Sequence, residues 1–231
     1  MHDGHIIVVK LGGSFVGSRH LTDWVGALAR CGGRSIIVPG GGPFADAVRQ
    51  SQARIGFSNV TAHYLALLAM EQFGRVLASL DPNFRVADTA TAIRGALRAG
   101  NVPIWLPVKM VLKCPEIPKS WDVTSDSLAA WLSGRVGARQ LVLVKHGGPF
   151  GNPLSAVDLA ALGIVDQAFP RFLASSGAQA SIVAAEASVA TQKAIAERGT
   201  PGTPIDLHEL IAKGLLAPLW PKSKSHAGDG H

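Results

Sequence analysis

The chain has 231 residues, of which 47% are hydrophobic, and a formal net charge of +6. This composition predicts a soluble globular protein, and no apolar run approaches the roughly 20 residues of a membrane-spanning helix. The N-terminus shows neither the basic cluster nor the apolar core of a signal peptide, so we expect a cytoplasmic protein with no membrane partner. The basic residues are scattered and the two cysteines lack zinc-binding spacing, which argues against nucleic-acid binding and a structural zinc.

The first half of the chain alternates apolar strands with amphipathic helices. Residues 6–9 form a β-branched run that is typical of a strand buried on both faces, residues 21–28 have helical spacing, and residues 35–38 form a second apolar strand. Helices are predicted over roughly 43–54, 59–79 and 89–99, followed by a strand at 102–106 and a loop to about 123. This order predicts β-α-β units and therefore a parallel sheet.

The second half continues the alternation. Helices are predicted at 124–136, 166–175 and 188–197, with strands at 141–144 and 180–184 and a short extended piece at 203–205. The pattern as a whole indicates a doubly wound α/β sandwich. We expect one domain over residues 1–217 and a flexible polar tail over 218–231.

Lys10 ends the first apolar strand, where an ammonium group is costly unless an anion or a hydrogen-bond partner meets it. Gly12, Gly13 and Ser14 follow, and backbone N–H groups of glycines can approach a ligand without interference from a Cβ atom. The segment therefore predicts a phosphate site. The alternative from these residues alone is a surface lysine followed by an ordinary turn.

Three further glycines, Gly40, Gly41 and Gly42, follow the second strand and precede a proline at the expected helix start. The same physical argument predicts a second anion site. Two alternatives remain: a glycine turn that serves close packing, and a dinucleotide-binding fingerprint. The fingerprint needs an acidic residue about 20 positions further on, and none is there.

Asp126 lies in the predicted first turn of the helix at 124–136. The helix dipole stabilises a carboxylate in the first turn, and this interaction alone can account for an aspartate at position 126. The alternative is that Asp126 orients phosphate-binding lysines, because phosphoryl transfer depends on positioning and charge neutralisation.

Taken in order, four motifs resemble those of the amino acid kinase family: residues 9–14 (VKLGGS), 38–43 (VPGGGP), 124–126 (TSD) and 143–145 (LVK). The resemblance implies a three-layer αβα sandwich with a mainly parallel open sheet. It also implies an ATP-dependent kinase that uses Mg²⁺, with the acceptor bound by residues of about 1–120 and ATP by residues of about 121–217.

The resemblance assigns roles to residues at matching positions and assigns no residue to a metal. Lys10, Asp126 and Lys193 would be catalytic, with Lys193 the least closely matched. The resemblance implies that the ATP phosphates are bound by Lys10, Gly12, Gly13 and Ser14. The rest of the nucleotide would be bound by Lys145, His146 and Gly147. The acceptor would be bound by Gly40, Gly41, Gly42, Arg49 and Lys109.

Two longer segments, 120–131 (SWDVTSDSLAAW) and 199–205 (GTPGTPI), are similar to one branch of that family, the aminomethyl-furanmethanol phosphate kinases of tetrahydromethanopterin biosynthesis. The similarity implies a phosphorylated acceptor that becomes a diphosphate. A uridylate or isopentenyl phosphate kinase and a non-catalytic nucleotide-binding or storage protein remain as alternatives. The helix at 59–79 has an apolar face through which we expect copies of the chain to associate.

Overall fold

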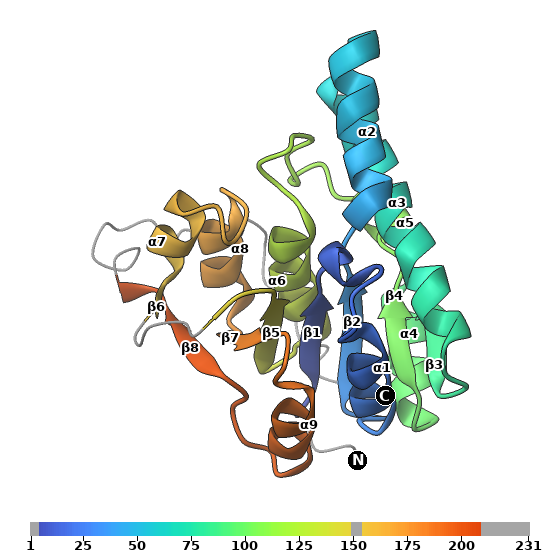
Figure 1. Ribbon diagram of the computed structural model, residues 1–231, viewed down its shortest axis with the longest axis vertical. Coiled ribbons are helices and arrows are strands. Elements are labelled where there is room, and N and C mark those ends of the chain that lie inside the picture. Colours follow the sequence, from blue (N-terminus) through green and yellow to red (C-terminus); the bar gives the residue numbers. More distant parts are fainter. Residues whose placement is uncertain (1–4, 149–153, 209–231) are drawn as a thin grey trace, which may run out of the picture.

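The computed structural model describes residues 5–148 and 154–208, which form an eight-stranded sheet with helices on both faces (Figure 1). In spatial order the strands are β3 (Phe84–Ala87), β4 (Val102–Trp105), β2 (Ser35–Pro39), β1 (Ile7–Leu11), β5 (Gln140–Lys145), β7 (Gln179–Ala184), β8 (Thr203–Asp206) and β6 (Leu154–Ser155). Neighbouring strands are parallel except for the antiparallel pair β7 and β8. The predicted α/β class and mainly parallel sheet are therefore confirmed.

Two pairs of helices enclose the centre of the sheet. On one face, α1 (Leu21–Ala29) packs against α9 (Ser188–Ala196), and on the other, α6 (Ser125–Val136) packs against α8 (Phe169–Ser176). The long helices α2 (Gly42–Ile55) and α3 (Asn59–Ser79) pack against each other, and α2 extends beyond the sheet (Figure 1). The shorter helices are η1 (Gly13–Phe15), α4 (Ala90–Arg98), α5 (Val108–Val111) and α7 (Ala156–Ala161).

The central strand β1 is buried on both faces, and its side chains alternate between two hydrophobic clusters. Ile7 and Val9 pack in the cluster with α1 and α9, whereas Val8 packs in the cluster with α6 and α8. Because side chains two positions apart share one face of a strand, Lys10 projects on the same side as Val8, toward α6. This places an ammonium group at the end of a buried strand, next to the first turn of that helix.

The predicted strands and long helices are confirmed within a few residues, but five short elements were not predicted, among them the three-residue η1. The strand β3 was missed because it is an edge strand whose two middle residues, Arg85 and Val86, are exposed, so its sequence lacks a buried apolar run. The elements α5, β6 and α7 have only four, two and six residues, too few to show a period. The expected tail at 218–231 lies outside the described residues, and none of the described helices is long and apolar enough to cross a membrane.

Candidate active site

Three segments meet where the parallel strands β2, β1 and β5 end. The register pairs Lys10 with Val38 on one side and with Leu143 on the other, so the three strands end side by side. Because the chain leaves β1 for β2 on one side while β5 lies on the other, this edge is a point where the strand order reverses, the usual place for a ligand in an open α/β sheet. The loops after β1 and β2, the end of β5 and the start of α6 therefore converge here.

A buried carboxylate joins two lysines at this edge. The Nζ atom of Lys10 lies 3.0 Å from Oδ1 of Asp126, and Nζ of Lys145 lies 2.9 Å from Oδ2 of the same residue. The side chains of Lys10 and Asp126 are only 7% and 6% exposed, and that of Lys145 is 15% exposed. We call these three residues the lysine–aspartate cluster. It carries a net charge of +1, because one carboxylate faces two ammonium groups.

The charges within the lysine–aspartate cluster change its pKa values. Burial alone raises the pKa of Asp126, but the positive charges of Lys10 and Lys145 outweigh burial and hold that pKa below its ordinary value. Burial, followed by the repulsion from Lys10, lowers the pKa of Lys145 to about 8, although the charge of Asp126 opposes the change. Asp126 is therefore ionised at neutral pH, and Lys145 titrates closer to neutral pH than an ordinary lysine does.

A second carboxylate, that of the half-buried Asp166, holds the first turn of α6 in place. Its Oδ2 atom accepts hydrogen bonds from the backbone N–H of Thr124 (3.0 Å), the hydroxyl of Thr124 (2.8 Å) and the backbone N–H of Ser127 (3.0 Å), and its Oδ1 accepts from the Ser127 hydroxyl. Burial, and then the charge of Asp126, raises the pKa of Asp166. Sequence reasoning missed this residue, because the groups that it binds lie 39 and 42 positions earlier and leave no local signal.

The two glycine loops pack backbone against backbone. A Cβ atom added to Gly13 would overlap the backbone nitrogen of Gly42, and one added to Gly42 would overlap the carbonyl oxygen of Gly13. Gly42 also has a φ of 50°, in the left-handed region that favours glycine. Both predicted anion loops are therefore one structural unit, held in addition by a hydrogen bond of 2.8 Å that the Gly40 N–H donates to the Leu11 carbonyl.

A cavity of about 240 Å³ lies against this unit. It is lined by Lys10, Lys145, the glycines of both loops, Ser14, and residues of α2, α3 and the segment at 120–125. Of the predicted site residues, the structure brings to it Lys10, Gly12, Gly13, Ser14, Gly40, Gly41, Gly42, Arg49 and Lys145. Asp126 lies directly behind the two lysines.

The wall of the cavity formed by α2, α3 and the 120–125 segment carries an acid, a base, an aromatic ring and a histidine. The guanidinium carbon of Arg49 lies 4.2 Å from the centre of the Trp121 ring, whose Nε1–H donates to Gln52 at 2.7 Å. Asp46, one helical turn before Arg49, also lines the cavity. His63 is 5% exposed, and burial, with the charge of Lys119 second, lowers its pKa, so its ring is neutral at pH 7.

Four predicted residues lie elsewhere. Lys109 does not line this cavity, because its Nζ atom pairs with Asp88 at 3.1 Å beside a separate hollow. The side chain of Lys193 is 73% exposed on α9, and its nearest carboxylate, Glu197, is 3.9 Å away. His146 packs on Phe15 with ring centres 4.3 Å apart, and Gly147 follows it in the open with a φ of 97°. The second ammonium group beside Asp126 therefore comes from Lys145 and not from Lys193.

The described residues suit ATP better than they suit a protein-bound magnesium ion. Two ammonium groups and glycine backbone at one edge fit the charge of a triphosphate. Both oxygens of Asp126 are occupied by lysines, and no group of three or more potential ligand side chains occurs among residues 5–148 and 154–208.

Comparisons with known proteins identify relatives of this chain. A sequence profile described as the Amino acid kinase family matches residues 5–147. The [5-(aminomethyl)furan-3-yl]methyl phosphate kinase of Methanocaldococcus jannaschii is 29% identical over 177 residues, which cover 72% of this chain and 82% of the relative.

Two solved structures share the fold at low sequence identity. The uridylate kinase of Archaeoglobus fulgidus superposes with a TM-score of 0.67 at 17% identity, covering 87% of this chain and all of the other. An isopentenyl phosphate kinase superposes with a TM-score of 0.58 at 17% identity, again covering 87% of this chain and all of the other. At such identities the superpositions bear on the fold alone.

Proposed function

Since this chain belongs to the amino acid kinase family and is a phosphotransferase, we propose that it transfers the γ-phosphate of ATP to a small phosphorylated acceptor. We further propose that this acceptor is [5-(aminomethyl)furan-3-yl]methyl phosphate, the compound named for the 29% identical relative. The product would be the corresponding diphosphate. The observation that carries the proposal is the lysine–aspartate cluster beside a cavity lined by glycine backbone.

The proposed chemistry depends on the two ammonium groups of the cluster. Each ammonium group has three N–H donors. Lys145 donates one to Asp126 and Lys10 contacts the same carboxylate as an ion pair, so both lysines retain donors for oxygen atoms of the transferred phosphoryl group. These donors are fixed before the reaction, so they stabilise the developing charge without rearrangement. Asp126 has both oxygens bound to lysines, so its proposed role is to position them rather than to attack or to accept a proton.

The proposed division of the site follows the two glycine loops. Gly12 and Gly13 lie next to Lys10, and we assign them to the ATP phosphates. Gly41 and Gly42, at the start of α2, are assigned to the phosphate of the acceptor, where the helix N-terminus adds partial positive charge. Because the loops pack on each other, the two phosphates would be held at a fixed separation, as in-line transfer requires.

The far wall of the cavity carries side chains that complement the proposed acceptor. That acceptor has an amine, a furan ring and a phosphate. Asp46 could pair with the protonated amine, Trp121 offers an apolar wall for the ring, and Arg49 could pair with the phosphate. A cavity of about 240 Å³ also fits a small acceptor.

The test is phosphoryl transfer by the purified full-length protein, with ³¹P NMR to detect diphosphate products. The substrates are ATP and one of three acceptors: the aminomethyl-furan phosphate, UMP or isopentenyl phosphate. We expect the highest kcat/KM for the furan compound. A higher value for UMP or isopentenyl phosphate would overturn the choice of acceptor, and binding of ATP without transfer to any acceptor would favour the non-catalytic alternative.

A matched pair of acceptors tests the role of Asp46. In the Asp46→Asn variant, KM for the aminomethyl compound should rise about ten-fold, because one ion pair is lost. The hydroxymethyl analogue, which has no amine, should show the same KM with the variant as with the unmodified protein. Equal effects on both acceptors would contradict the assignment.

We also propose that copies of the chain associate through the region where α2 meets α3. Ile55, Val60 and Tyr64 are 75%, 56% and 40% exposed there, which is costly for apolar side chains in water. Sedimentation analysis should find an oligomer that Val60→Asp dissociates. A monomer at micromolar concentration would contradict this proposal.

A further inference from the structure

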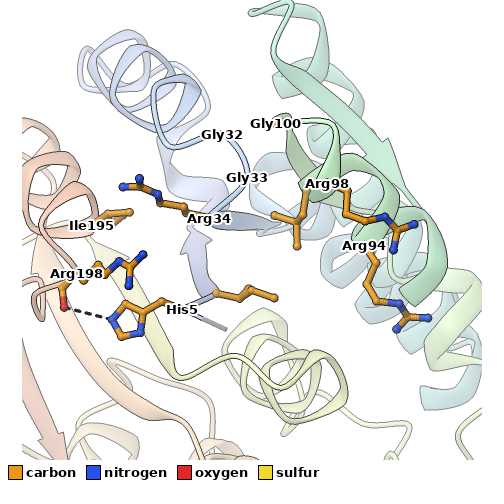
Figure 2. Close-up of a pocket in the computed structure, with 11 residues that line it drawn as sticks. His5, Gly32, Gly33, Arg34, Arg94, Arg98, Gly100, Ile195 and Arg198 are labelled. Atoms are coloured by element: carbon orange, nitrogen blue, oxygen red, sulfur yellow. Dashed lines mark hydrogen bonds between the residues drawn. The ribbon is translucent and has the colours of Figure 1, made fainter. Parts of the chain in front are cut away.

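A second cavity, of about 460 Å³, lies where the strands begin (Figure 2). It is bordered by His5 and Ile6 at the start of β1, by the turn before β2 and by residues of α4 and α9. None of the residues that line it belongs to the candidate active site. It is therefore a separate feature of the molecule, and its volume is in the range of sites for small molecules.

Four arginines border this cavity. Figure 2 shows Arg34 and Arg198 on one side with His5, and Arg94 and Arg98 on the other. No aspartate or glutamate is among the described residues that line it, and neither Arg94 nor Arg98 forms an ion pair with a carboxylate in the described part of the chain. Because the four arginines are all positively charged, each of them would attract an anion that enters the cavity.

The arginines are joined to a defined framework. Arg34 donates a hydrogen bond of 3.1 Å to the Ala196 carbonyl, and His5 shares one of 3.2 Å with the Arg198 carbonyl. Arg198 has a φ of 59°, and it is the one non-glycine residue of the described chain with a positive φ. This left-handed conformation is the usual one for the residue that follows a helix C-cap, so the end of α9 fixes the backbone of Arg198 at the cavity.

The rest of the lining is apolar or glycine. Ile6, Leu97 and Ile195 contribute aliphatic surface, and Leu97 and Ile195 are 5% and 1% exposed. Glycines at 32, 33 and 100 let the two turns approach, since a Cβ atom on Gly32 would overlap the Gly100 carbonyl. A ligand would therefore meet an aliphatic and glycine surface with two arginines on either side of it, of which Arg94 also donates a hydrogen bond to Thr91 at 3.4 Å.

We propose that this cavity binds a small phosphorylated organic molecule with more than one negative charge. The arginines would pair with its phosphate oxygens, because the planar guanidinium group matches phosphate in two-point hydrogen bonding. The aliphatic and glycine surface would contact its organic portion. Such a ligand would connect α4 with α9, elements that come from different halves of the sequence. This inference does not depend on the identity of the acceptor.

The test is calorimetric titration of the Lys10→Met protein with inorganic triphosphate, since this background weakens binding at the lysine–aspartate cluster. We expect one binding event per chain, with Kd raised at least ten-fold by adding Arg94→Gln and Arg98→Gln. The matched control adds Arg54→Gln and Arg171→Gln, which remove the same charge from exposed positions on α2 and α8, and it should change Kd less than two-fold. Absence of binding, or equal effects of the two double substitutions, would overturn the proposal.

A second pair of probes tests the organic portion. In the same Lys10→Met background, 1-naphthyl phosphate should bind at least five-fold more tightly than inorganic phosphate, and the difference should disappear with Arg94→Gln and Arg98→Gln. Circular dichroism before each titration verifies that every variant is folded. Equal affinity for the two probes would show that the aliphatic and glycine surface contributes nothing and would reduce the site to a simple anion contact, contrary to the proposal.

Discussion

Replacing Asp126 with asparagine separates the two explanations that its sequence position allows. If the carboxylate only interacts favourably with the helix dipole, its loss lowers the free energy of unfolding by about 0.3–1 kcal/mol. If it neutralises Lys10 and Lys145, its loss leaves two ammonium groups buried against a neutral amide. Breaking a buried ion pair costs about 3–5 kcal/mol, because the remaining charge has no partner.

The lower end of that range is expected. Lys145 already has its pKa lowered to about 8, and loss of Asp126 removes the charge that opposes this change, so Lys145 can release its proton and limit the cost. We therefore expect the free energy of unfolding to fall by about 3 kcal/mol. For a chain of this size, this corresponds to a decrease in Tm of roughly 6–12 °C. Turnover should fall about 100-fold, since the ammonium groups would no longer be held in position.

Urea unfolding and steady-state transfer are the two assays. The matched control is Asp158→Asn, which removes an exposed first-turn carboxylate from α7 and should cost less than 1 kcal/mol with unchanged turnover. The neutralising role of Asp126 is refuted if Asp126→Asn lowers the free energy of unfolding by no more than Asp158→Asn does. It is also refuted if the variant unfolds more easily while turnover stays within two-fold, because the carboxylate would then serve stability alone.

Three further predictions concern the same site. Lys10→Met should lower kcat about 100- to 1,000-fold, by loss of one fixed donor to the transferred phosphoryl group, whereas Lys193→Met, at an exposed position, should stay within two-fold in the same transfer assay. The kcat/KM of the unmodified enzyme should fall as pH rises through about 8, where Lys145 loses its charge, and Lys145→Arg should remove this decline. Between pH 8 and the ordinary lysine pKa of 10.5, Lys145 is protonated in the unfolded chain but largely deprotonated in the folded one. Lys145 therefore makes the free energy of unfolding rise with pH over this range, which urea titrations at several pH values can measure. Asp166→Ala should cost about 2 kcal/mol and also lower kcat, whereas a kcat equal to that of the unmodified enzyme would mean that Asp166 does not position Asp126.

Much of the fold could be predicted because its central elements have strong local signals. The run at β1 is β-branched and ends in a lysine and two glycines, which indicated both a buried strand and an anion site. The site could be predicted only in part. That Asp126 contacts Lys145 depends on the pairing of β1 with β5, and that Asp166 binds the start of α6 depends on the packing of α8. Neither relation leaves a trace in local sequence, and for this reason Lys145 was predicted to bind the nucleotide and Lys193 to be the second catalytic lysine.

The contact between Gly13 and Gly42 limits how this enzyme could be given a new acceptor. A side chain at either position would separate the two loops, so Gly13 and Gly42 are closed to substitution in any redesign of the site. The opposite wall is open to change, and there Asp46 and Arg49 come from α2 and Trp121 from the 120–125 segment. A library directed at those three positions would therefore explore acceptor chemistry while leaving the transfer machinery intact.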